Sequence, residues 1–354
     1  MIINPGRPAE FTFNSEELKI ELDELVTESA VQPYLHTLYS MPHMEGDGVG
    51  AVLLENKSGR FAVKAKYFID ATGDADLCAQ FGATYKRMES LQPPTSCAKF
   101  HGLEAIGLSR FKELIRTYGE EFGLRKDGGW GGSSACVPGV SFHAETHVYD
   151  TDCSDGDMLT AAEIEGRRQI RAMMDIVRKY GSDHGSISLA ALCAYIGVRE
   201  TRHIKSRHPL TVDSVLSGAR FEDAIANGTR QADIHHHDKP GMTFKFLDGR
   251  ETYSSNDVKW EGRWRPESAE NPTFWQIPYR SLLPEGPGNV IACGRSIDAD
   301  PEAFGAVRLM VSTNQMGEAA GVAAFLALSD GKRFDQVDPL ELRSALERGG
   351  SIML

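Results

Sequence analysis

The residues best suited to chemistry lie in four short stretches of the sequence. Residues 70–76 read DATGDAD and residues 233–241 read DIHHHDKPG, so carboxylates and imidazoles are concentrated there. Residues 199–207 read RETRHIKSR, and residues 294–310 read GRSIDADPEAFGAVRLM, so arginines stand near histidine or glycine. Such groups can hold a metal ion, move a proton, or bind a phosphate or carboxylate.

The three aspartates of residues 70–76 have a metal-binding and a structural interpretation. A metal site needs carboxylates that converge on one ion, but Asp70 lies on an apolar run, and no other acidic residue follows closely. The glycine and distant glutamate of an EF-hand loop are not in register either. We therefore predict that Asp74 or Asp76 caps a helix over residues 75–81, and metal binding is the minor alternative.

The histidine cluster at residues 233–238 also has two interpretations. Consecutive residues of a strand point to opposite faces, so at most His235 and His237 share one. Because no second cluster of His or Cys at ligand spacing is evident, the pattern favours a polar loop or histidines that face a pocket. A histidine there could bind substrate or transfer a proton, since its pKa lies near neutrality. A metal-dependent hydrolase using Asp233, His235 and His237 remains an alternative.

Residues 199–216, RETRHIKSRHPLTVDSVL, form the most basic stretch, with Arg199, Arg202, Lys205 and Arg207 beside two histidines. A solvated pair of strands explains this alternation of charged and apolar residues. A face that binds an anionic substrate is the functional alternative. Charge patterning alone leaves both interpretations open.

Two short apolar strands must position the aspartates and the arginines. Residues 67–71 and residues 289–294 are apolar runs bounded by glycine, which suits buried parallel strands. The second run continues into a glycine, Arg295, a loop and a helix. This order is typical of a site that binds an anionic or dinucleotide ligand at the carboxyl edge of a sheet. Arg295 and Arg308 can donate bidentate hydrogen bonds to such a ligand. A strand, a turn and a helix with two surface arginines is the structural alternative.

The helix predicted over residues 307–327 carries a stripe of small side chains. Gly317 and Gly321 are four residues apart, as are Ala320 and Ala324. Such a stripe allows close approach by a neighbouring backbone or by a flat ring. Close packing of the helix on a sheet explains it equally well.

The first part of the chain contains further regular elements. Asn14 with Glu17 predicts the start of a helix over residues 15–28. Alternating apolar residues predict strands over residues 49–54 and 61–65.

The middle of the chain differs in composition and in its pattern of predicted elements from both ends. Residues 89–150 are rich in Gly, Pro and Ser, and Thr160 with Glu163 predicts the start of a second long helix. The apolar face of that helix is formed by Ile170, Met173, Met174 and Val177. We therefore predict an α/β fold with a mostly parallel sheet built from residues 1–88 and 285–354, and an inserted α+β domain over residues 89–284.

The composition excludes several classes of protein. The net charge of −12 argues against a basic surface for nucleic acid or anionic lipid. No apolar run reaches the roughly 18 residues of a membrane span, and no signal-peptide pattern is visible. The six cysteines form no C-x-x-C pair, which favours reduced thiols in a cytoplasmic protein. We expect neither a nucleic-acid nor a membrane partner.

Four stretches, together and in this order, resemble the family of FAD-dependent oxidoreductases with a split, glutathione-reductase-like flavin domain. They are FIDATGDADLCAQFGA, RETRHIKSRHPLTVDSV, FEDAIANGTRQADIH and IPYRSLLPEGPGNVIACGRSIDADPEAFGAVRLMVSTNQMGEAAGVAAFLA. The resemblance implies an FAD/NAD(P)-binding-type sheet, an inserted substrate domain and FAD as the cofactor.

The resemblance also implies which residues contact the cofactor. It places Ala71, Thr72, Gly73 and Asp74 against the dinucleotide part of FAD, and Gly294 and Arg295 near the flavin or its pyrophosphate. It places five further residues beside the isoalloxazine ring: Arg308, Gln315, Met316, Gly317 and Ala320.

The predicted reaction is the transfer of a hydride from a small organic substrate to the flavin. Our predicted substrate-side residues are His235, Arg199, Arg202 and Arg280. His235 would act as a base or hydrogen-bond donor, and the arginines would hold an anionic or polyhydroxylated group.

The sequence departs from the family in one respect. The family begins with a strand, a G-x-G-x-x-G turn and a helix that hold the pyrophosphate, and the sequence contains no such motif. We therefore expect a flavin domain that is incomplete at its N-terminus: a fragment, a truncated gene product or one part of a split protein. A homo-oligomer, or a separate chain that supplies the unit, is the predicted partner. A non-catalytic remnant or interaction module with the same fold remains an alternative.

Overall fold

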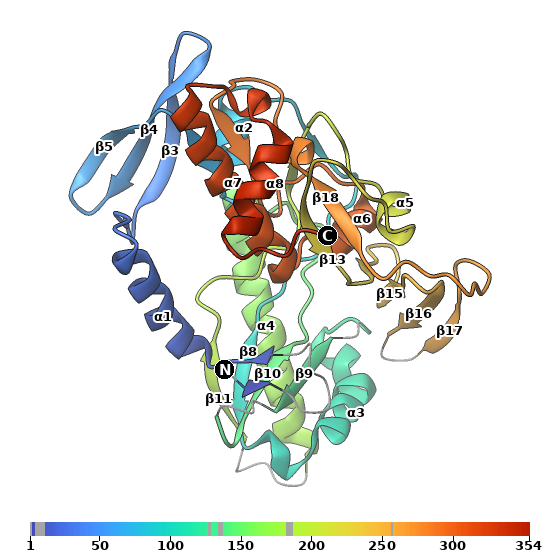
Figure 1. Cartoon of the computed structure of the whole chain (residues 1–354). Coiled ribbons are helices and arrows are strands. Elements are labelled where there is room, and N and C mark those ends of the chain that lie inside the picture. Colours follow the sequence, from blue (N-terminus) through green and yellow to red (C-terminus); the bar gives the residue numbers. More distant parts are fainter. Residues whose placement is uncertain (1, 4–10, 127–128, 134–136, 182–186, 256–257) are drawn as a thin grey trace. The chain divides into compact units, whose positions relative to one another are not determined.

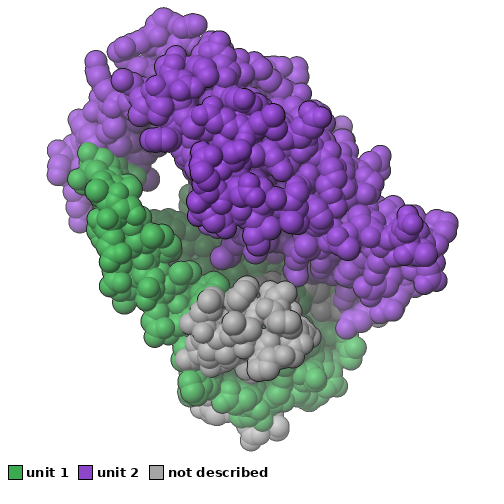
Figure 2. Space-filling view, viewed as in Figure 1, with its two compact units in different colours: residues 1–37, 94–148, 160–197 green, residues 38–93, 149–159, 198–354 purple. Residues whose placement is uncertain are grey.

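The computed structural model describes residues 2–3, 11–126, 129–133, 137–181, 187–255 and 258–354. They form two compact units, coloured in Figure 2. Unit 1 contains residues 1–37, 94–148 and 160–197, and unit 2 contains residues 38–93, 149–159 and 198–354. The predicted division into residues 1–88 with 285–354 and residues 89–284 stays a prediction.

Unit 1 is built on an antiparallel four-stranded sheet in the order β11-β8-β10-β9. Its strands are β8 Ala98–His101, β9 Trp130–Ser133, β10 Val140–Ala144 and β11 Ser188–Leu192. Its helical elements are α1 Ser15–Glu28, η1 Leu103–Ala105, α3 Leu108–Tyr118, η2 Gly119–Phe122 and most of α4 Gly156–Tyr180. A separate ladder pairs β1 Ile2–Ile3 with β2 Phe11–Thr12.

Helix α4 supplies much of the core of unit 1. The four residues of its predicted apolar face are all buried, which confirms that face: Ile170, Met173, Met174 and Val177. The helix begins one turn before the predicted start at Thr160, because Asp155 Oδ1 accepts hydrogen bonds from the N–H groups of Asp157 and Met158. A carboxylate at this place satisfies N–H groups that have no partner within the helix.

Helix α1 confirms the predicted cap at its N-terminus. The Asn14 side chain accepts a hydrogen bond from the Glu16 N–H at 3.0 Å. No residue of α1 is buried, so the helix owes its position to its ends and not to a packed face.

Unit 2 contains several small sheets (Figure 1). One antiparallel meander contains β3 Leu38–Glu45, β4 Gly48–Asn56 and β5 Gly59–Lys64, and another contains β14 Ala232–His235, β15 Met242–Lys245, β16 Arg250–Ser254 and β17 Lys259–Arg263. Antiparallel pairs join β7 Tyr85–Arg87 to β12 Arg202–Ile204, and β13 Ala224–Gly228 to β18 Trp275–Pro278. Strands β6 Phe68–Asp70 and β19 Val290–Ala292 pair in parallel.

The prediction of a mostly parallel sheet is not confirmed. Among the named strands of the described ranges, β6 and β19 form the only parallel pair, as the two apolar runs predicted. Most other neighbours follow each other in sequence and are joined by short turns, such as the one that contains Gly46 at φ 64°. A short turn returns the chain antiparallel, whereas a parallel pair needs a long crossover.

The helices of unit 2 cover the parallel pair and one another. They are α2 Asp76–Gln80, α5 Val212–Leu216, η3 Tyr279–Leu282, α6 Pro301–Val307, α7 Met310–Asp330, η4 Phe334–Gln336 and α8 Pro339–Arg348. Helices α7 and α8 lie side by side (Figure 1) and bury Phe334 and Leu342 in the largest core cluster. In the part of the chain that is described, no helix combines the length and apolarity needed to cross a bilayer.

The helix predicted over residues 307–327 is confirmed as α7, which runs from Met310 to Asp330, and the loop predicted before it contains a further short helix, α6. Asp300 caps α6 by accepting a hydrogen bond from the Ala303 N–H at 2.7 Å, and Pro301 occupies its first turn. Leu309 is extended, with φ −76° and ψ 152°, so the chain breaks between the helices. This break places Arg308 at the end of α6.

Candidate functional site

The candidate site begins at the carboxyl ends of β6 and β19. Because these strands are parallel, with Asp70 opposite Ala292, the segments that follow them leave the sheet at the same edge. Residues 71–76 form one segment, and residues 293–300 form the other, which leads into α6. This edge is where α/β proteins bind nucleotides and other anionic ligands.

Asp70 shapes the first of these segments from a buried position. Its Oδ1 accepts hydrogen bonds from the Thr72 N–H at 3.1 Å and the Thr72 hydroxyl at 2.7 Å. Its Oδ2 accepts from the Cys78 N–H at 2.9 Å. Burial, followed by the charge of Asp70, raises the pKa of the Cys78 thiol, which stays protonated. Because the turn engages both carboxylate oxygens, Asp70 has a structural role.

Gly73 and Arg295 join the two segments. Gly73 adopts φ 81°, and a Cβ at this position would lie 2.5 Å from Arg295 Nη2, so only glycine fits. Arg295 Nη1 and Nη2 each lie 3.3 Å from Asp74 Oδ1. The same oxygen accepts a hydrogen bond from the Thr201 hydroxyl at 2.8 Å. Asp74 therefore orients Arg295 at this edge.

The start of α2 corrects the predicted cap. The N-cap residue is Ala75, at φ 55°, whose side chain accepts no hydrogen bond, and the side chains of Asp70 and Thr72 satisfy N–H groups of the first turn instead. The Thr72 hydroxyl accepts a hydrogen bond from the Asp76 N–H at 3.0 Å, while the Asp76 carboxylate lies 2.8 Å from Arg202 Nη1. The prediction that Asp74 or Asp76 caps this helix is wrong, because both carboxylates pair with side chains from distant segments.

A second group of charges lies where α6 packs on β14. His235 Nε2 is 3.4 Å from Asp233 Oδ1, and Arg308 Nη2 is 3.1 Å from Asp233 Oδ2. The packing is close because residue 305 is glycine: a Cβ there would lie 2.3 Å from the Asp233 carbonyl oxygen. We call Asp233, His235 and Arg308 the buried cluster.

Burial and charge set the protonation states in the buried cluster. Burial lowers the pKa of His235 despite the neighbouring Asp233, so the imidazole is neutral near neutral pH. Although burial opposes it, the nearby His235 and the charges of Arg308 and Arg199 lower the pKa of Asp233 to about 2. Burial also lowers the pKa of Arg308, against the charge of Asp233, but an arginine keeps its proton in proteins.

The structure brings predicted substrate and cofactor residues together in unit 2. The charge of Arg199 acts on both His235 and Asp233, and the charge of Arg295 acts on Arg308. His235, Arg199, Arg295 and Arg308 therefore belong to one region, although they come from four separate segments. This convergence was not evident from their spacing.

Arg202 and Arg280 have other partners. Besides Asp76, Arg202 Nη1 binds the Asp74 carbonyl oxygen at 3.0 Å, so Arg202 supports the turn after β6. Arg280 forms an ion pair with Asp223, and its guanidinium carbon lies 5.3 Å from the ring centroid of Phe221. Their substrate-binding roles stay predictions.

The predicted residues of α7 differ in what they contact. Gln315 Oε1 accepts from the Asn227 N–H at 2.9 Å, and its Nε2 donates to the Asn227 carbonyl at 3.0 Å, so Gln315 fastens β13. Met316 and Ala320 are fully buried in the core. Gly317 is exposed, and a Cβ there would meet nothing within 4 Å. Only Gly317 of these four presents an open face, and contact of α7 with FAD stays a prediction.

Two residues of the site were missed in the sequence, Thr201 and Gly305. Glycine is costly inside a helix, so Gly305 within PEAFGAV signals close approach by another backbone. Thr201 offers no comparable signal, because its partner Asp74 lies 127 positions away.

The residues at the carboxyl edge fit FAD. Gly294 adopts φ 94°, and a Cβ there would meet nothing within 4 Å, so the backbone is open to a ligand. Among the described residues, Arg308 Nε and Ser312 Oγ are buried polar atoms without a hydrogen-bond partner. Together with Arg295, they provide donors for an anionic or polar group.

The metal-dependent hydrolase alternative gains no support. Within the ranges that the structure describes, no group of three or more His, Cys, Asp or Glu residues is arranged to hold a metal ion. His235 faces Asp233, His236 Nε2 lies 2.7 Å from Thr243 Oγ1, and His237 is exposed.

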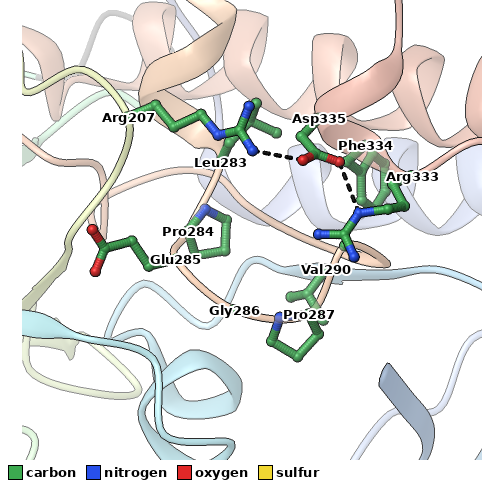
Figure 3. Close-up of a pocket in the computed structure, with 11 residues that line it drawn as sticks. Arg207, Leu283, Pro284, Glu285, Gly286, Pro287, Val290, Arg333, Phe334 and Asp335 are labelled. Carbon is green, nitrogen blue, oxygen red and sulfur yellow. Dashed lines mark hydrogen bonds and ion pairs between the residues drawn. The ribbon is translucent and has the colours of Figure 1, made fainter. Parts of the chain in front are cut away.

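A cavity of about 260 Å³ lies at the amino end of β19 (Figure 3). It is lined by residues 283–288, Val290, residues 333–335 and Arg207. Arg207 Nη2 lies 2.6 Å from Asp335 Oδ2, and Arg333 Nε lies 3.0 Å from Asp335 Oδ1. We call these three residues the surface triad. The cavity lies at the opposite end of β19 from Gly294, so it is separate from the carboxyl edge.

Comparison with known proteins gives one family match. The family described as FAD dependent oxidoreductase matches residues 3–346. A search of curated proteins finds no match.

Several solved structures are similar to this chain at low sequence identity. A triple mutant of the flavin-dependent brominase Bmp2 is 11% identical, with a TM-score of 0.39 over 94% of this chain and 59% of that one. Aklavinone-11 hydroxylase, in a ternary complex with FAD and aklavinone, is 12% identical, with a TM-score of 0.38 over 90% of this chain and 42% of that one. The p-nitrophenol 4-monooxygenase PnpA from Pseudomonas putida DLL-E4 is 8% identical, with a TM-score of 0.35 over 96% of this chain and 57% of that one. The chain thus spans less than two thirds of the length of each of these proteins.

The match over residues 3–346 covers nearly the whole chain, and the open carboxyl edge with its cationic side chains agrees with it. Neither a metal-dependent hydrolase nor a non-catalytic remnant is supported by these findings. The chain belongs to the FAD dependent oxidoreductase family, whose cofactor is FAD.

Proposed function

We propose that this chain acts in an oxidoreductase that removes a hydride from a carbon of a small organic substrate. The observation that most supports this proposal is the buried cluster, which lies where α6, the helix that follows residues 293–300, packs on β14. When bound, FAD supplies the hydride acceptor. The chain itself binds the cofactor, holds the substrate and takes up the substrate proton.

We propose that the carboxyl edge holds the dinucleotide part of FAD. Gly294 leaves the backbone accessible, and Arg295, oriented by Asp74, directs its charge to the pyrophosphate. Residues 71–74 form the other side of this edge. The ring-facing residues are proposed to be those of the resemblance: Arg308, Gln315, Met316, Gly317 and Ala320.

His235 is the proposed proton acceptor. Its Nε2 faces the ionised Asp233, so the tautomer with a proton on Nε2 is favoured and Nδ1 is the basic nitrogen. As a hydride leaves a carbinol carbon, the hydroxyl proton passes to Nδ1. The neighbouring Asp233 carboxylate stabilises the imidazolium that forms.

Arg199 is the proposed anchor for an anionic or polyhydroxylated part of the substrate. Its charge acts on His235, so Arg199 lies within electrostatic reach of the proposed base. Arg202 and Arg280 are proposed in secondary roles. Residues 89–284 would form the substrate domain, and residues 1–88 with 285–354 the FAD domain.

The first test is the binding of FAD to the purified chain, followed by quenching of flavin fluorescence. Arg295→Met removes a charge-assisted donor and is expected to weaken the affinity about tenfold or more. Arg207→Met, in the surface triad, is the matched control and is expected to leave the affinity unchanged. A wild-type chain that binds no FAD would overturn the proposal for this chain, and equal affinities for both variants would remove Arg295 from the site.

The second test separates chemistry from cofactor binding. The FAD-loaded chain is mixed without oxygen with a panel of hydroxy acids and polyols, and bleaching of the visible flavin band is followed. His235→Gln is expected to slow bleaching about 100-fold or more while FAD affinity is kept. His237→Gln, at an exposed position of the same cluster, is the control and should match the wild type. An undiminished rate for His235→Gln would contradict the proposed role of His235.

A further inference from the structure

The edge strand of unit 1 is weakly held. All five residues of β11 are exposed, so the strand buries no side chain. It pairs antiparallel with β8, and the register shifts between Leu189 and Ala191. Backbone hydrogen bonds in an exposed, irregular edge strand contribute little to stability, so such a strand opens easily.

Two cysteines face each other at the end of this ladder. The register pairs Leu192 with Ala98, which makes Cys193 and Cys97 the next facing pair. The Cys193 N–H donates to the Cys97 carbonyl oxygen at 3.0 Å, and the Cys97 N–H lies 3.3 Å from Cys193 Sγ. Both residues carry thiols and are partly exposed.

This placement satisfies the backbone requirement of a disulfide. Residues that face each other in an antiparallel ladder have Cα atoms about 4.5–5.5 Å apart, and a disulfide accepts about 4.4–6.8 Å. The thiol of Cys193 already lies over the backbone of Cys97, so rotation of the side chains could bring the sulfur atoms together without moving the strands.

Three other cysteines are poorly suited to oxidation. Cys78, Cys153 and Cys293 are buried. Burial, with the charge of Asp70 second, raises the pKa of the Cys78 thiol, and the same two causes raise the pKa of Cys293 to about 11. A protonated and buried thiol reacts slowly, because the thiolate is the nucleophile.

We propose that Cys97 and Cys193 form a reversible disulfide with a low-molecular-weight disulfide, such as oxidised glutathione, as the oxidant. The thiolate of one cysteine attacks a sulfur of oxidised glutathione, which releases one reduced glutathione and leaves a mixed disulfide. The second cysteine attacks the protein sulfur of that mixed disulfide, which releases the second glutathione and forms the Cys97–Cys193 bond. Two protein thiols are oxidised, one glutathione disulfide is reduced, and the two thiol protons end on the released glutathiones.

The bond would fasten β11 to β8. It would also close a long chain segment, from residue 97 to residue 193, and long loops gain most from a cross-link. An exposed disulfide at a ladder end is easily reduced again, which suits a reversible modification. The proposal depends on neither FAD binding nor the buried cluster.

The test is oxidation of the full chain in glutathione redox buffers, followed by alkylation of the remaining thiols and non-reducing peptide mapping. We expect a single crosslinked peptide pair that contains Cys97 and Cys193, reversed by reduced glutathione. Cys97→Ser and Cys193→Ser should each abolish the crosslink. Cys97→Ala and Cys193→Ala should do the same, which excludes an effect of the serine hydroxyl. Cys153→Ser is the control and should leave the crosslink intact. A mixed disulfide that never closes, or a bridge that uses another cysteine, would overturn the proposal.

A second readout is the stability of the oxidised chain. The melting temperature is expected to rise by about 5 °C or more on oxidation, and proteolytic cleavage near β11 should slow. Neither change should occur in Cys97→Ala. Equal shifts in the wild type and in Cys97→Ala would show that the effect does not come from this bond.

Discussion

Arginine and aspartate meet in two places in unit 2, in the buried cluster between α6 and β14 and in the surface triad near the amino end of β19, but in different surroundings. In the buried cluster, the side chains of Arg308 and Asp233 are 10% and 22% exposed. In the surface triad (Figure 3), the Asp335 side chain is 20% exposed, like that of Asp233, but its two partners are more open: the side chains of Arg207 and Arg333 are 55% and 46% exposed. The two groups therefore differ in their arginines: the guanidinium of Arg308 is desolvated, whereas those of Arg207 and Arg333 stay hydrated.

The difference shows how burial changes the role of an ion pair. Exposed pairs contribute about 0–1 kcal/mol and are screened by salt, because water already solvates both charges. In a buried pair, each charge depends on the other, since neither has enough water to replace its partner. The charge of Arg308 in the buried cluster can therefore be redirected toward a ligand, whereas the arginines of the surface triad are solvated already.

Of the substitutions that test this comparison, Arg308→Met is expected to change the free energy of unfolding most. It leaves the Asp233 carboxylate without its main charge partner, which should lower the free energy of unfolding by about 3–5 kcal/mol. Chemical denaturation of wild type and variant measures the loss. A loss below about 1 kcal/mol would show that the cluster behaves like an exposed pair.

Gly305→Ala tests whether close packing creates the buried cluster. A Cβ at residue 305 would lie 2.3 Å from a backbone oxygen, so α6 or β14 must move, at a cost of about 3 kcal/mol. Gly317→Ala is the matched control in an open position of α7, where alanine should stabilise the helix by about 0.5–1 kcal/mol. Thermal or chemical denaturation of both variants shows whether each substitution raises or lowers the stability. Equal changes would show that the contact at residue 305 is not needed.

The pH dependence of stability tests the charge state of Asp233. The pKa of this carboxyl is lowered from 3.8 to about 2 in the folded chain. Its contribution, on the order of 2 kcal/mol, should be fully present above about pH 4 and lost as the pH falls through about 2. Asp233→Asn should lack this loss. Denaturation midpoints across the acid range measure it, and parallel profiles for wild type and variant would contradict the assignment.

Arg207→Met is expected to have the smallest effect. It removes one exposed partner of Asp335 and leaves Arg333, so the cost should stay below about 1 kcal/mol and shrink further in salt. Denaturation at low and high ionic strength provides the measurement. A loss of unfolding free energy as large as that of Arg308→Met would show that the surface triad and the buried cluster do not differ.

Short-range patterns predicted much of the fold. The Asn14 cap, the apolar face of α4 and the apolar strands β6 and β19 were all evident, because each depends on neighbours in sequence. The cap of α2 was wrongly predicted, because Asp74 and Asp76 pair with side chains from distant segments instead of capping the helix. Helix α6 was missed because its seven residues lie in a stretch predicted as a loop.

The sequence by itself determined the family, because its glycine, arginine and small-residue stretches occur in the same order as in the flavin domain of that family. Only the tertiary structure decided which charges meet. Asp233 and Arg308 are 75 positions apart, and Asp74 and Arg295 are 221 positions apart, so no local period connects them. The protonation state of His235 was likewise decided by folding, because the pKa of a side chain depends on burial and on charges that distant segments bring beside it.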